Sequence, residues 1–317
     1  NPDGVVLEVK AVGLNHLDTW VRRGIDGHTF PLPLVPGCDF SGVVTEVGKD
    51  VSGIHVGDKI LAAPGLSCGH CRECTMGQDQ LCHDYGILGE TVNGGCSEKA
   101  ALPATNAIPL PEGLSFEEAA AFPLTFLTAW HMLVARCDIQ KGMDVLVHAA
   151  GSGVGSAAVQ IARLFEARVI ATASTDEKLE KAKQLGADIG INYEQTDWTK
   201  EVRSITNKRG VDIVFEHVGE KTISDSIRCL AKGGKVVTCG ATTGPKLEAN
   251  LQMIFFKSLS ILGSTMGSRD ELYRLVDLVG RGLLHPVIDR VLPLEDVAKA
   301  HDAMAKREQF GKIILIP

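Results

Sequence analysis

Hydrophobic and polar residues alternate over short runs in the first 122 residues, and glycines separate these runs. The segments GVVLEVKAVGL (4–14) and SGVVTEVGKDVSGIHVGDKI (41–60) show this pattern. Alternation with a period of two is typical of strands with one buried face, and Gly-containing breaks are typical of the turns between them. This part of the chain is therefore predicted to be mostly β.

The pattern changes at LSFEEAAAFPLTFLTAWHMLVAR (114–136), where apolar residues recur at helical spacing and Ser115 with Glu118 predicts a capping box. Beyond it, strand-like and helix-like segments alternate, which predicts an α/β fold with a parallel, doubly wound sheet over residues 123–266. Residues 267–317 add a helix and a final strand. The expected strands are DVLVHAA, ARVIATAS, VDIVFEHVG, GGKVVTCG, SLSILGST and GKIILIP, and the expected helices are VGSAAVQIARLF, TDEKLEKAKQLGA and RDELYRLVDLVGRG.

Composition and charge narrow the functional classes. The chain is 44% hydrophobic and 22% charged, as ordinary soluble proteins are. A net charge of -7 without a basic cluster argues against nucleic acid or an anionic membrane as the main partner. No apolar run approaches the roughly 20 residues of a membrane span. No signal peptide is recognised, although the chain begins at Asn1 and an N-terminal stretch is expected to be missing.

Four of the nine cysteines, Cys68, Cys71, Cys74 and Cys82, lie within GLSCGHCRECTMGQDQLC (65–82). Thiolates at this spacing can complete a tetrahedral zinc site with no open position, so such a zinc is structural and takes no part in catalysis. The other five cysteines are scattered, which indicates a reducing compartment, the cytoplasm, rather than a disulfide framework. We predict one structural zinc per chain, with free or disulfide-bonded thiols as the alternative.

The segment HAAGSGVGSAA follows a predicted strand and precedes a predicted helix, as a phosphate-binding loop does. Its glycines allow the backbone to approach a pyrophosphate above the N-terminus of the helix. Because a Gly-rich turn alone is a weak signal, the prediction of dinucleotide binding depends on this context. The residues predicted to form the loop are Gly151, Ser152, Gly153, Val154 and Gly155.

The next strand, in RVIATASTDEK, discriminates between NADH and NADPH. NADH sites usually end this strand with an acid that binds the ribose 2′-hydroxyl, but Ala173 and Ser174 stand there. Asp176 has a simpler explanation, because Ser174 and Glu177 resemble a capping box and an acid in the first turn suits the helix dipole. A cation there is unfavourable, so Lys178 favours a bound 2′-phosphate, with a solvated surface lysine as the alternative. We predict NADPH, and NADH is less favoured.

These motifs together resemble the medium-chain dehydrogenase/reductase superfamily. GLNHLD, PGCDFSGVV, the four-cysteine lobe, PLTFLTAW and the Gly-rich loop occur in the order of that family, and the resemblance covers essentially the whole chain. It implies a GroES-like, mostly β catalytic domain formed by residues 1–122 and 267–317. It further implies a Rossmann cofactor domain formed by residues 123–266, with the active site in the cleft between the two. By the same resemblance, the usual N-terminal strands of the family are expected to be shortened here.

Zinc alcohol dehydrogenases of the family hold a catalytic zinc, and this chain departs from their ligands. The matching positions are Asn15, Cys38 and Leu124, of which only the cysteine binds zinc well. The position of the proton-relaying hydroxyl is Leu17. The departures resemble the quinone oxidoreductase branch, which has an asparagine at the first position and uses NADPH in a zinc-free cleft.

The same branch implies further cofactor contacts. The residues that match its 2′-phosphate contacts are Ser174, Lys178 and Tyr193. The ends of EHVG and TCGATTG, the latter with Gly240, would surround the nicotinamide. His217, in EHVG, ends a predicted strand and is a candidate for a cofactor contact.

The resemblance implies hydride transfer from NADPH to a conjugated small-molecule acceptor, a quinone or an α,β-unsaturated carbonyl. Asn15, His16 and Thr128 would be the catalytic residues, since hydrogen-bond donors must polarise an acceptor that no metal polarises. His16 is alternatively a contact of the cofactor phosphate, as a basic residue at this position often is in the family. A zinc-dependent alcohol dehydrogenase with the ligands Cys38, His16 and Asp39 is the first alternative. A cofactor-binding protein without turnover is the second. Cys38 is alternatively a redox thiol or a small packed residue.

The predicted strand in SLSILGST also bears on assembly. An exposed sheet edge invites pairing with another chain. The resemblance to the family, together with this edge, implies a homodimer, with a tetramer as the alternative.

Overall fold

The computed structural model describes residues 1–25 and 27–317, which form two compact units. Unit 1 comprises Asn1–Leu127 and Gly267–Pro317, and unit 2 comprises Thr128–Met266. The first boundary falls inside helix α4 (Pro123–Trp130) rather than at residue 122. Each unit encloses an apolar core of its own.

Unit 1 is built on a largely antiparallel sheet of strand order β14-β15-β1-β2-β3-β7, with β6 paired to β1. The alternation in residues 4–14 buries Val5, Leu7 and Val9, whereas Glu8 is exposed, as the period of two predicted. The strands are β1 (Gly4–Gly13), β2 (Asp39–Val47), β3 (Lys59–Ala62), β6 (Lys99–Pro103), β7 (Ala107–Pro109), β14 (Ile288–Pro293) and β15 (Lys312–Ile316).

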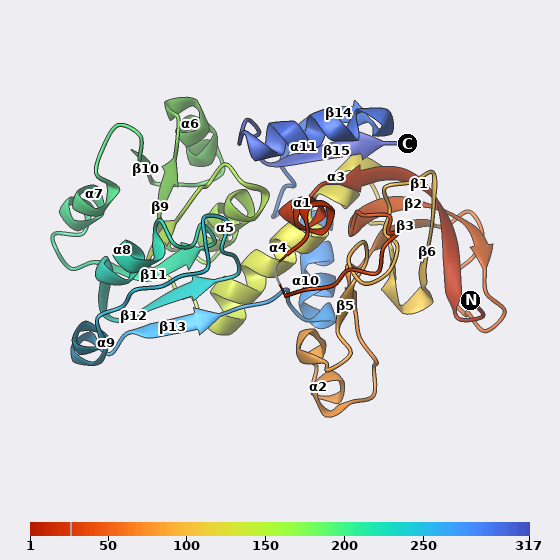
Figure 1. Ribbon diagram of the computed structural model, residues 1–317, viewed down its shortest axis with the longest axis horizontal. Helices are drawn as coiled ribbons and strands as arrows, with labels where there is room; N and C mark the ends of the chain where they lie inside the picture. The colour runs from red at the N-terminus through yellow and green to blue at the C-terminus, as the bar shows by residue number, and fades with distance from the viewer. Residues whose placement is uncertain (26) are drawn as a thin grey trace. The chain divides into compact units, whose positions relative to one another are not determined.

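A lobe and several helices complete unit 1. The lobe contains the short strands β4 (Gly65–Leu66) and β5 (Gly86–Ile87) and the one-turn helix α2 (Arg72–Thr75), shown in orange in Figure 1. The other helices are α1 (His16–Arg23), α3 (Phe116–Ala121), α10 (Arg269–Gly280) and α11 (Val297–Ala305). Single 3₁₀ turns are η1 (Asp79–Leu81), η2 (Ala104–Asn106) and η4 (Leu294–Asp296).

The helical segment at residues 114–136 is divided into three pieces. α3 begins at the predicted capping box of Ser115 and Glu118, α4 begins at Pro123, and the π-helical stretch η3 (His131–Arg136) follows. Proline has no N–H and its ring clashes with the preceding turn, so it begins a helix better than it continues one. The apolar spacing predicted helix, and one proline interrupts it.

Unit 2 contains a parallel sheet of strand order β10-β9-β8-β11-β12-β13. The arrows of β11, β12 and β13 run in one direction in Figure 1. The order reverses between β8 and β11, so their carboxyl ends form the switch point at which such sheets bind ligands. The predicted Rossmann fold is confirmed. The strands are β8 (Asp144–Val147), β9 (Arg168–Ala173), β10 (Ile189–Asn192), β11 (Val211–Glu216), β12 (Leu230–Thr238) and β13 (Ser260–Gly263).

The helices of unit 2 connect these strands, and one helix start differs from the prediction. Thr175, not Ser174, is the N-cap of α6, and its hydroxyl accepts the N–H of Lys178 at 3.3 Å. The predicted capping box of Ser174 and Glu177 was therefore wrong by one residue, since a serine or a threonine can cap equally plausibly. The helices are α5 (Gly153–Leu164), α6 (Asp176–Gln184), α7 (Trp198–Ile205), α8 (Ile223–Arg228) and α9 (Leu251–Lys257). Among the described residues, no helix has both the length and the apolarity that a membrane crossing requires.

Candidate zinc, cofactor and catalytic sites

The four predicted zinc ligands converge in the lobe of unit 1. The Sγ atoms of Cys68, Cys71, Cys74 and Cys82 lie within 4.8 Å of one another, and those of Cys68 and Cys74 are 3.9 Å apart. Sulfurs bound tetrahedrally to one zinc at about 2.3 Å lie about 3.8 Å apart. The backbone N–H of Cys71 lies 3.4 Å from the sulfur of Cys68, where it can stabilise the thiolate that zinc binds. The residues present therefore fit one structural zinc ion.

The lobe is also tied to a helix far away in the sequence. Asp79, in η1, accepts the N–H of Arg269, the first residue of α10, at 2.9 Å. A carboxylate at a helix N-terminus satisfies an orphan donor and suits the helix dipole. This bond ties the lobe to α10.

The predicted phosphate loop connects β8 to α5. The Oγ atom of Ser152 caps α5 by accepting the N–H of Gly155 at 2.9 Å. A Cβ atom at Gly155 would lie 2.5 Å from the carbonyl oxygen of Ala149, so only glycine permits this close packing. Gly151 is buried, and residues 152–154 are half-exposed at the positive end of the helix dipole. The loop fits the pyrophosphate of a dinucleotide.

The residues predicted to contact a 2′-phosphate come from neighbouring elements of unit 2. Ser174 follows β9, Lys178 lies in the first turn of α6, and Tyr193 follows β10. Because β9 and β10 pair in parallel and end side by side, Ser174 and Tyr193 lie at the same edge of the sheet. All three side chains are half-buried.

Asp176, the first acid after β9, is engaged within the protein. Its Oδ1 accepts from Nδ2 of Asn192 at 2.7 Å, and its Oδ2 accepts from Nε2 of Gln195 at 3.3 Å. The carboxylate therefore joins α6 to the end of β10. Neither partner of Asp176 was predicted from the sequence.

Asn15 lies in a buried cluster with Asp39 and Lys312. The Nζ atom of Lys312 donates to Oδ1 of Asn15 at 2.7 Å and lies 3.0 Å from Oδ2 of Asp39. The Nδ2 atom of Asn15 donates to the same Oδ2 at 2.9 Å. The side chains of Asp39 and Lys312 are 0% and 4% exposed, so this is a buried, hydrogen-bonded ion pair.

Lys312 was not among the residues predicted from the sequence to form the site. The lysine begins β15, which pairs antiparallel with β1 and so reaches the residues just after β1. A lone lysine before the apolar run IILIP was the only signal in the sequence. A charged residue in such a run is rarely buried unless it has a partner.

The remaining polar atoms of the cluster are also bonded within unit 1. The Nδ2 atom of Asn15 lies 3.3 Å from both the carbonyl oxygen of Gly13 and the sulfur of Cys38. The Oδ1 atom of Asp39 accepts the backbone N–H of Leu124 at 2.9 Å. The cluster therefore holds the Asn15 side chain in one orientation.

Cys38 and Asp18 flank this cluster. Burial raises the pKa of the Cys38 thiol well above its usual value, helped by the negative charge of Asp39, so the thiol stays protonated. Asp18 accepts the backbone N–H groups of Asn15 at 2.7 Å and Gly37 at 3.0 Å. Burial raises the pKa of Asp18 to about 6 despite these bonds.

The other predicted catalytic residues are His16 and Thr128. His16 directly follows Asn15 in the sequence, and Thr128 is the first residue of unit 2. His16 is the first residue of α1 and is half-buried, and Thr128 is buried in α4. Within residues 1–25 and 27–317, the lobe cysteines are the one group of three or more His, Cys, Asp or Glu side chains that could hold a metal. Cys38, His16 and Asp39 form no such group.

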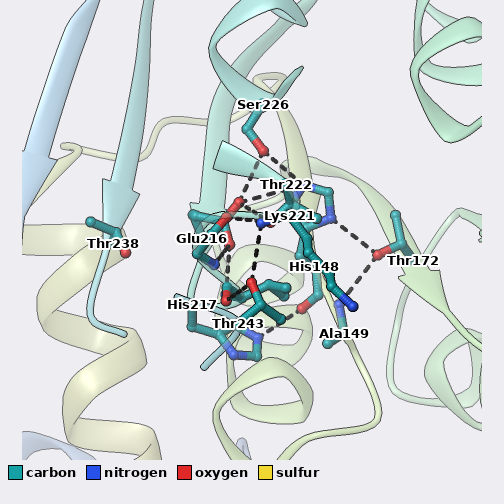
Figure 2. A network of polar contacts seen from close by, with 12 residues as sticks. His148, Ala149, Thr172, Glu216, His217, Lys221, Thr222, Ser226, Thr238 and Thr243 are labelled. Carbon is teal, nitrogen blue, oxygen red and sulfur yellow. Dashed lines mark hydrogen bonds and ion pairs between the residues drawn. The ribbon is translucent and has the colours of Figure 1, made fainter. Parts of the chain in front are cut away.

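A polar network occupies the switch point of unit 2 (Figure 2). Glu216 ends β11, is fully buried, and accepts bonds from the backbone N–H groups of Val218 and Gly219 and from the hydroxyls of Thr222 and Ser226. The predicted nicotinamide neighbour Gly240 adjoins this network. A Cβ atom at Gly240 would lie 3.1 Å from the carbonyl oxygen of His217.

Comparison with known proteins places these features in a family. Residues 1–112 match the alcohol dehydrogenase GroES-like domain, and residues 153–281 match the zinc-binding dehydrogenase domain. A zinc-type alcohol dehydrogenase-like protein of Schizosaccharomyces pombe is 34% identical, with 99% of this chain and 91% of that protein covered. The chain belongs to the medium-chain dehydrogenase/reductase superfamily. The resemblance noted in the sequence is confirmed.

Other members of the superfamily resemble the chain over nearly its full length. The quinone oxidoreductase of Sus scrofa is 31% identical, with 98% of this chain and 88% of that protein covered. A solved structure of an NAD-dependent alcohol dehydrogenase is 48% identical with a TM-score of 0.96, covering 100% of this chain and 92% of that one. The chain is an NAD(P)-dependent oxidoreductase of this superfamily, as the sequence predicted.

Proposed function

We propose that this enzyme reduces quinones or α,β-unsaturated carbonyls with NADPH and uses no catalytic metal. The observation that carries the proposal is the buried cluster of Asn15, Asp39 and Lys312. By the resemblance in sequence, Asn15 stands where zinc alcohol dehydrogenases of the family have a zinc ligand. Asparagine is a poor zinc ligand and Leu124 contributes only a backbone N–H, so of these three positions Cys38 alone offers a good zinc ligand, whereas a catalytic zinc needs about three.

Hydrogen-bond donors must then stabilise the oxygen that gains negative charge. When bound, NADPH supplies a hydride, which adds to the β-carbon of the acceptor. The resulting enolate oxygen takes a proton from solvent. Lys312 has three N–H groups and uses two of them in the cluster, so its charge polarises Asn15 and fixes its orientation. His16, which directly follows Asn15, is the proposed donor to the substrate oxygen, and Thr128 remains a proposed substrate contact.

A saturated alcohol makes a different demand on this site. It must lose its hydroxyl proton before or during hydride transfer, which a metal assists by lowering the pKa of the bound oxygen. A conjugated acceptor needs only donors to the oxygen. The donor set of unit 1 therefore supports reduction of conjugated acceptors over oxidation of alcohols.

Zinc content tests the absence of a catalytic metal. Elemental mass spectrometry on protein purified without added metal should give about one zinc per chain. Cys74→Ser should remove that zinc, whereas the matched variant Cys38→Ser should leave the zinc content unchanged. About two zinc ions per chain, with one lost in Cys38→Ser, would overturn the proposal.

The proposed preference for NADPH is inferred from the residues that follow β9. No acid directly follows the strand, and Asp176 is bonded to Asn192. Lys178→Gln should lower kcat/KM for NADPH about tenfold and leave that for NADH unchanged, since a charge-assisted hydrogen bond contributes about this much. Lys183→Gln, which removes an exposed partner of Glu180 on the same helix, is the control. Equal kcat/KM for the two cofactors in the unmodified enzyme would refute this preference.

A second candidate function is oxidation of an alcohol with NAD⁺. The 48% identity to a structure named an NAD-dependent alcohol dehydrogenase favours it. Turnover of primary and secondary alcohols with NAD⁺, before and after removal of metal by a chelator, distinguishes the two functions. Alcohol turnover that disappears on chelation while the fold is retained would establish the second function.

For assembly, we propose a homodimer formed through β13. This strand is at the edge of the unit 2 sheet, and no other strand of the described residues pairs with its outer side. The preceding helix α9 exposes Leu251, Phe255 and Phe256, which are 75%, 62% and 74% exposed. Open edges and exposed apolar groups are typical of protein interfaces. Light scattering should give a dimer that Phe256→Asp dissociates, and a monomeric unmodified enzyme would contradict the proposal.

A further inference from the structure

A histidine directly follows each of the two central strands of unit 2. In one of them, His148, both ring nitrogens have hydrogen-bond partners within the protein. His148 follows β8 and His217 follows β11 (Figure 2). The Nδ1 atom of His148 lies 3.2 Å from the hydroxyl of Thr172, and its Nε2 lies 3.0 Å from that of Ser226. Ser226 gives its proton to the acceptor-only carboxylate of Glu216, so it accepts from Nε2. Both ring nitrogens of His148 are thereby satisfied, and burial lowers its pKa, which keeps the ring neutral.

His217 differs because only one of its ring nitrogens is used. Its Nε2 lies 2.9 Å from the backbone carbonyl oxygen of His148. A carbonyl only accepts, so Nε2 carries the proton and Nδ1 of the neutral ring carries a lone pair. Burial lowers the pKa of His217, which favours the neutral ring. Nothing in residues 1–25 and 27–317 donates a hydrogen bond to Nδ1.

The turn that carries His217 is fixed from both sides. The hydroxyl of Thr242 donates to the carbonyl oxygen of His217 at 3.2 Å. The next carbonyl, of Val218, accepts the N–H and the hydroxyl of Thr243, both at 2.8 Å. Glu216 holds the N–H of Val218 at 2.6 Å. These bonds fix the backbone around His217, and the bond from Nε2 to the His148 carbonyl fixes the ring, so Nδ1 is held in one position.

The strand order indicates which part of a dinucleotide meets this acceptor. β9 lies on one side of β8 and β11 lies on the other. A pyrophosphate at the start of α5 directs the adenosine ribose toward the end of β9, so the nicotinamide half extends toward β11. The ribose of that half offers two hydroxyl donors.

We propose that Nδ1 of His217 accepts a hydrogen bond from a hydroxyl of the nicotinamide-side ribose. The proposal rests on dinucleotide binding, which the proposed function requires, and is independent of the acceptor and of any catalytic metal. His217 is thus a cofactor-binding residue that also ties the phosphate loop to the end of β11 through the His148 carbonyl.

Two substitutions test the two ring nitrogens of His217 separately: the proposed acceptor Nδ1, and Nε2, which anchors the ring to the His148 carbonyl. His217→Gln places an N–H near the position of Nε2 and keeps the bond to the His148 carbonyl, but it removes the acceptor. His217→Asn places a carbonyl oxygen near the position of Nδ1 and keeps an acceptor, but it loses the anchor. Melting temperature and circular dichroism establish that each variant folds.

The test is a titration of each protein with NADP⁺ and with analogues that lack the 2′- or 3′-hydroxyl of the nicotinamide ribose. The unmodified enzyme should bind one of the two analogues about tenfold more weakly than NADP⁺, as expected for one hydrogen bond. His217→Gln should lose this discrimination, and His217→Asn should regain part of it. Equal discrimination by the unmodified enzyme and His217→Gln would overturn the proposal. Because the readout is binding, failure to reduce enones would refute the proposed function and leave this result intact.

Discussion

Replacing Lys312 with methionine isolates the energetic role of the buried ion pair in unit 1. Methionine has nearly the length of lysine and fills irregular space, so the substitution removes a charge with little change of volume. The Oδ2 atom of Asp39 would keep the bond from Asn15 and lose the ammonium at 3.0 Å. The Asp39 side chain is fully buried, so water cannot replace the lost partner.

Removing one partner of a buried pair typically costs about 3–5 kcal/mol, because the other charge stays desolvated. We expect Lys312→Met to lower the free energy of unfolding of unit 1 by this amount. Lys312→Met combined with Asp39→Asn removes both charges and keeps an oxygen for the N–H of Leu124. The double variant should therefore lose less than the sum of the two single losses, by about 2 kcal/mol or more.

The assay must report on unit 1 alone, since a chain with two units need not unfold in a single step. Trp20 belongs to unit 1, whereas Trp130 and Trp198 belong to unit 2. Urea unfolding followed by Trp20 fluorescence, with the other two tryptophans replaced by phenylalanine, isolates the unit. Lys299→Met, which breaks an exposed pair with Asp296, is the matched control.

An exposed ion pair contributes at most about 1 kcal/mol. If Lys312→Met destabilised unit 1 no more than Lys299→Met, the buried pair would not be energetically significant. The orienting role assigned to Lys312 beside Asn15 would then fail as well. A large loss in stability together with unchanged kcat would preserve the ion pair and refute only the catalytic part.

Three further predictions follow from the sites. Cys74→Ser should abolish zinc binding and lower the melting temperature of unit 1, while the Kd for NADPH, measured by titration, stays within about twofold because the lobe lies outside unit 2. The folded-state pKa of Asp18 is raised to about 6 from an unfolded value near 3.9, so stability present below about pH 4 should be lost as pH rises through 6. That loss is about 3 kcal/mol, and urea midpoints across this range should be flatter in Asp18→Asn. Gly155→Ala should cost about 1–3 kcal/mol and weaken cofactor binding, because its Cβ would lie 2.5 Å from the Ala149 carbonyl oxygen, and thermal unfolding with NADPH titration measures both.

The elements predicted well from the sequence are those that depend on residues close together in the chain. β1 was predicted because its alternation of buried and exposed residues is a property of consecutive residues. The Rossmann order was predicted because buried strands and amphipathic helices alternate along the chain. The cap of α6 was misplaced by one residue because Ser174 and Thr175 are both chemically suited to capping.

The site residues that sequence missed depend on contacts between distant segments. Lys312 is 297 positions from Asn15, and only the pairing of β15 with β1 brings them together. The tautomer of His217 follows from the carbonyl of His148, 69 positions earlier. The sequence shows which polar side chains are present, but not which of their donor and acceptor atoms are already hydrogen-bonded within the folded protein.

The zinc ligands are close together in the sequence, whereas the residues of the proposed reaction site come from distant segments. For this reason the cysteine motif is a poor guide to the chemistry. The lobe ligands lie within residues 68–82, so their convergence is nearly a local property and the spacing alone predicted it. Under the proposed function, the chemistry depends on Asn15, Asp39 and Lys312, which share no bond with the lobe cysteines among the described residues. A chain can therefore keep the structural zinc of an alcohol dehydrogenase while its reaction site changes, because neither site constrains the ligands of the other. Under the proposed function, this enzyme has made that change.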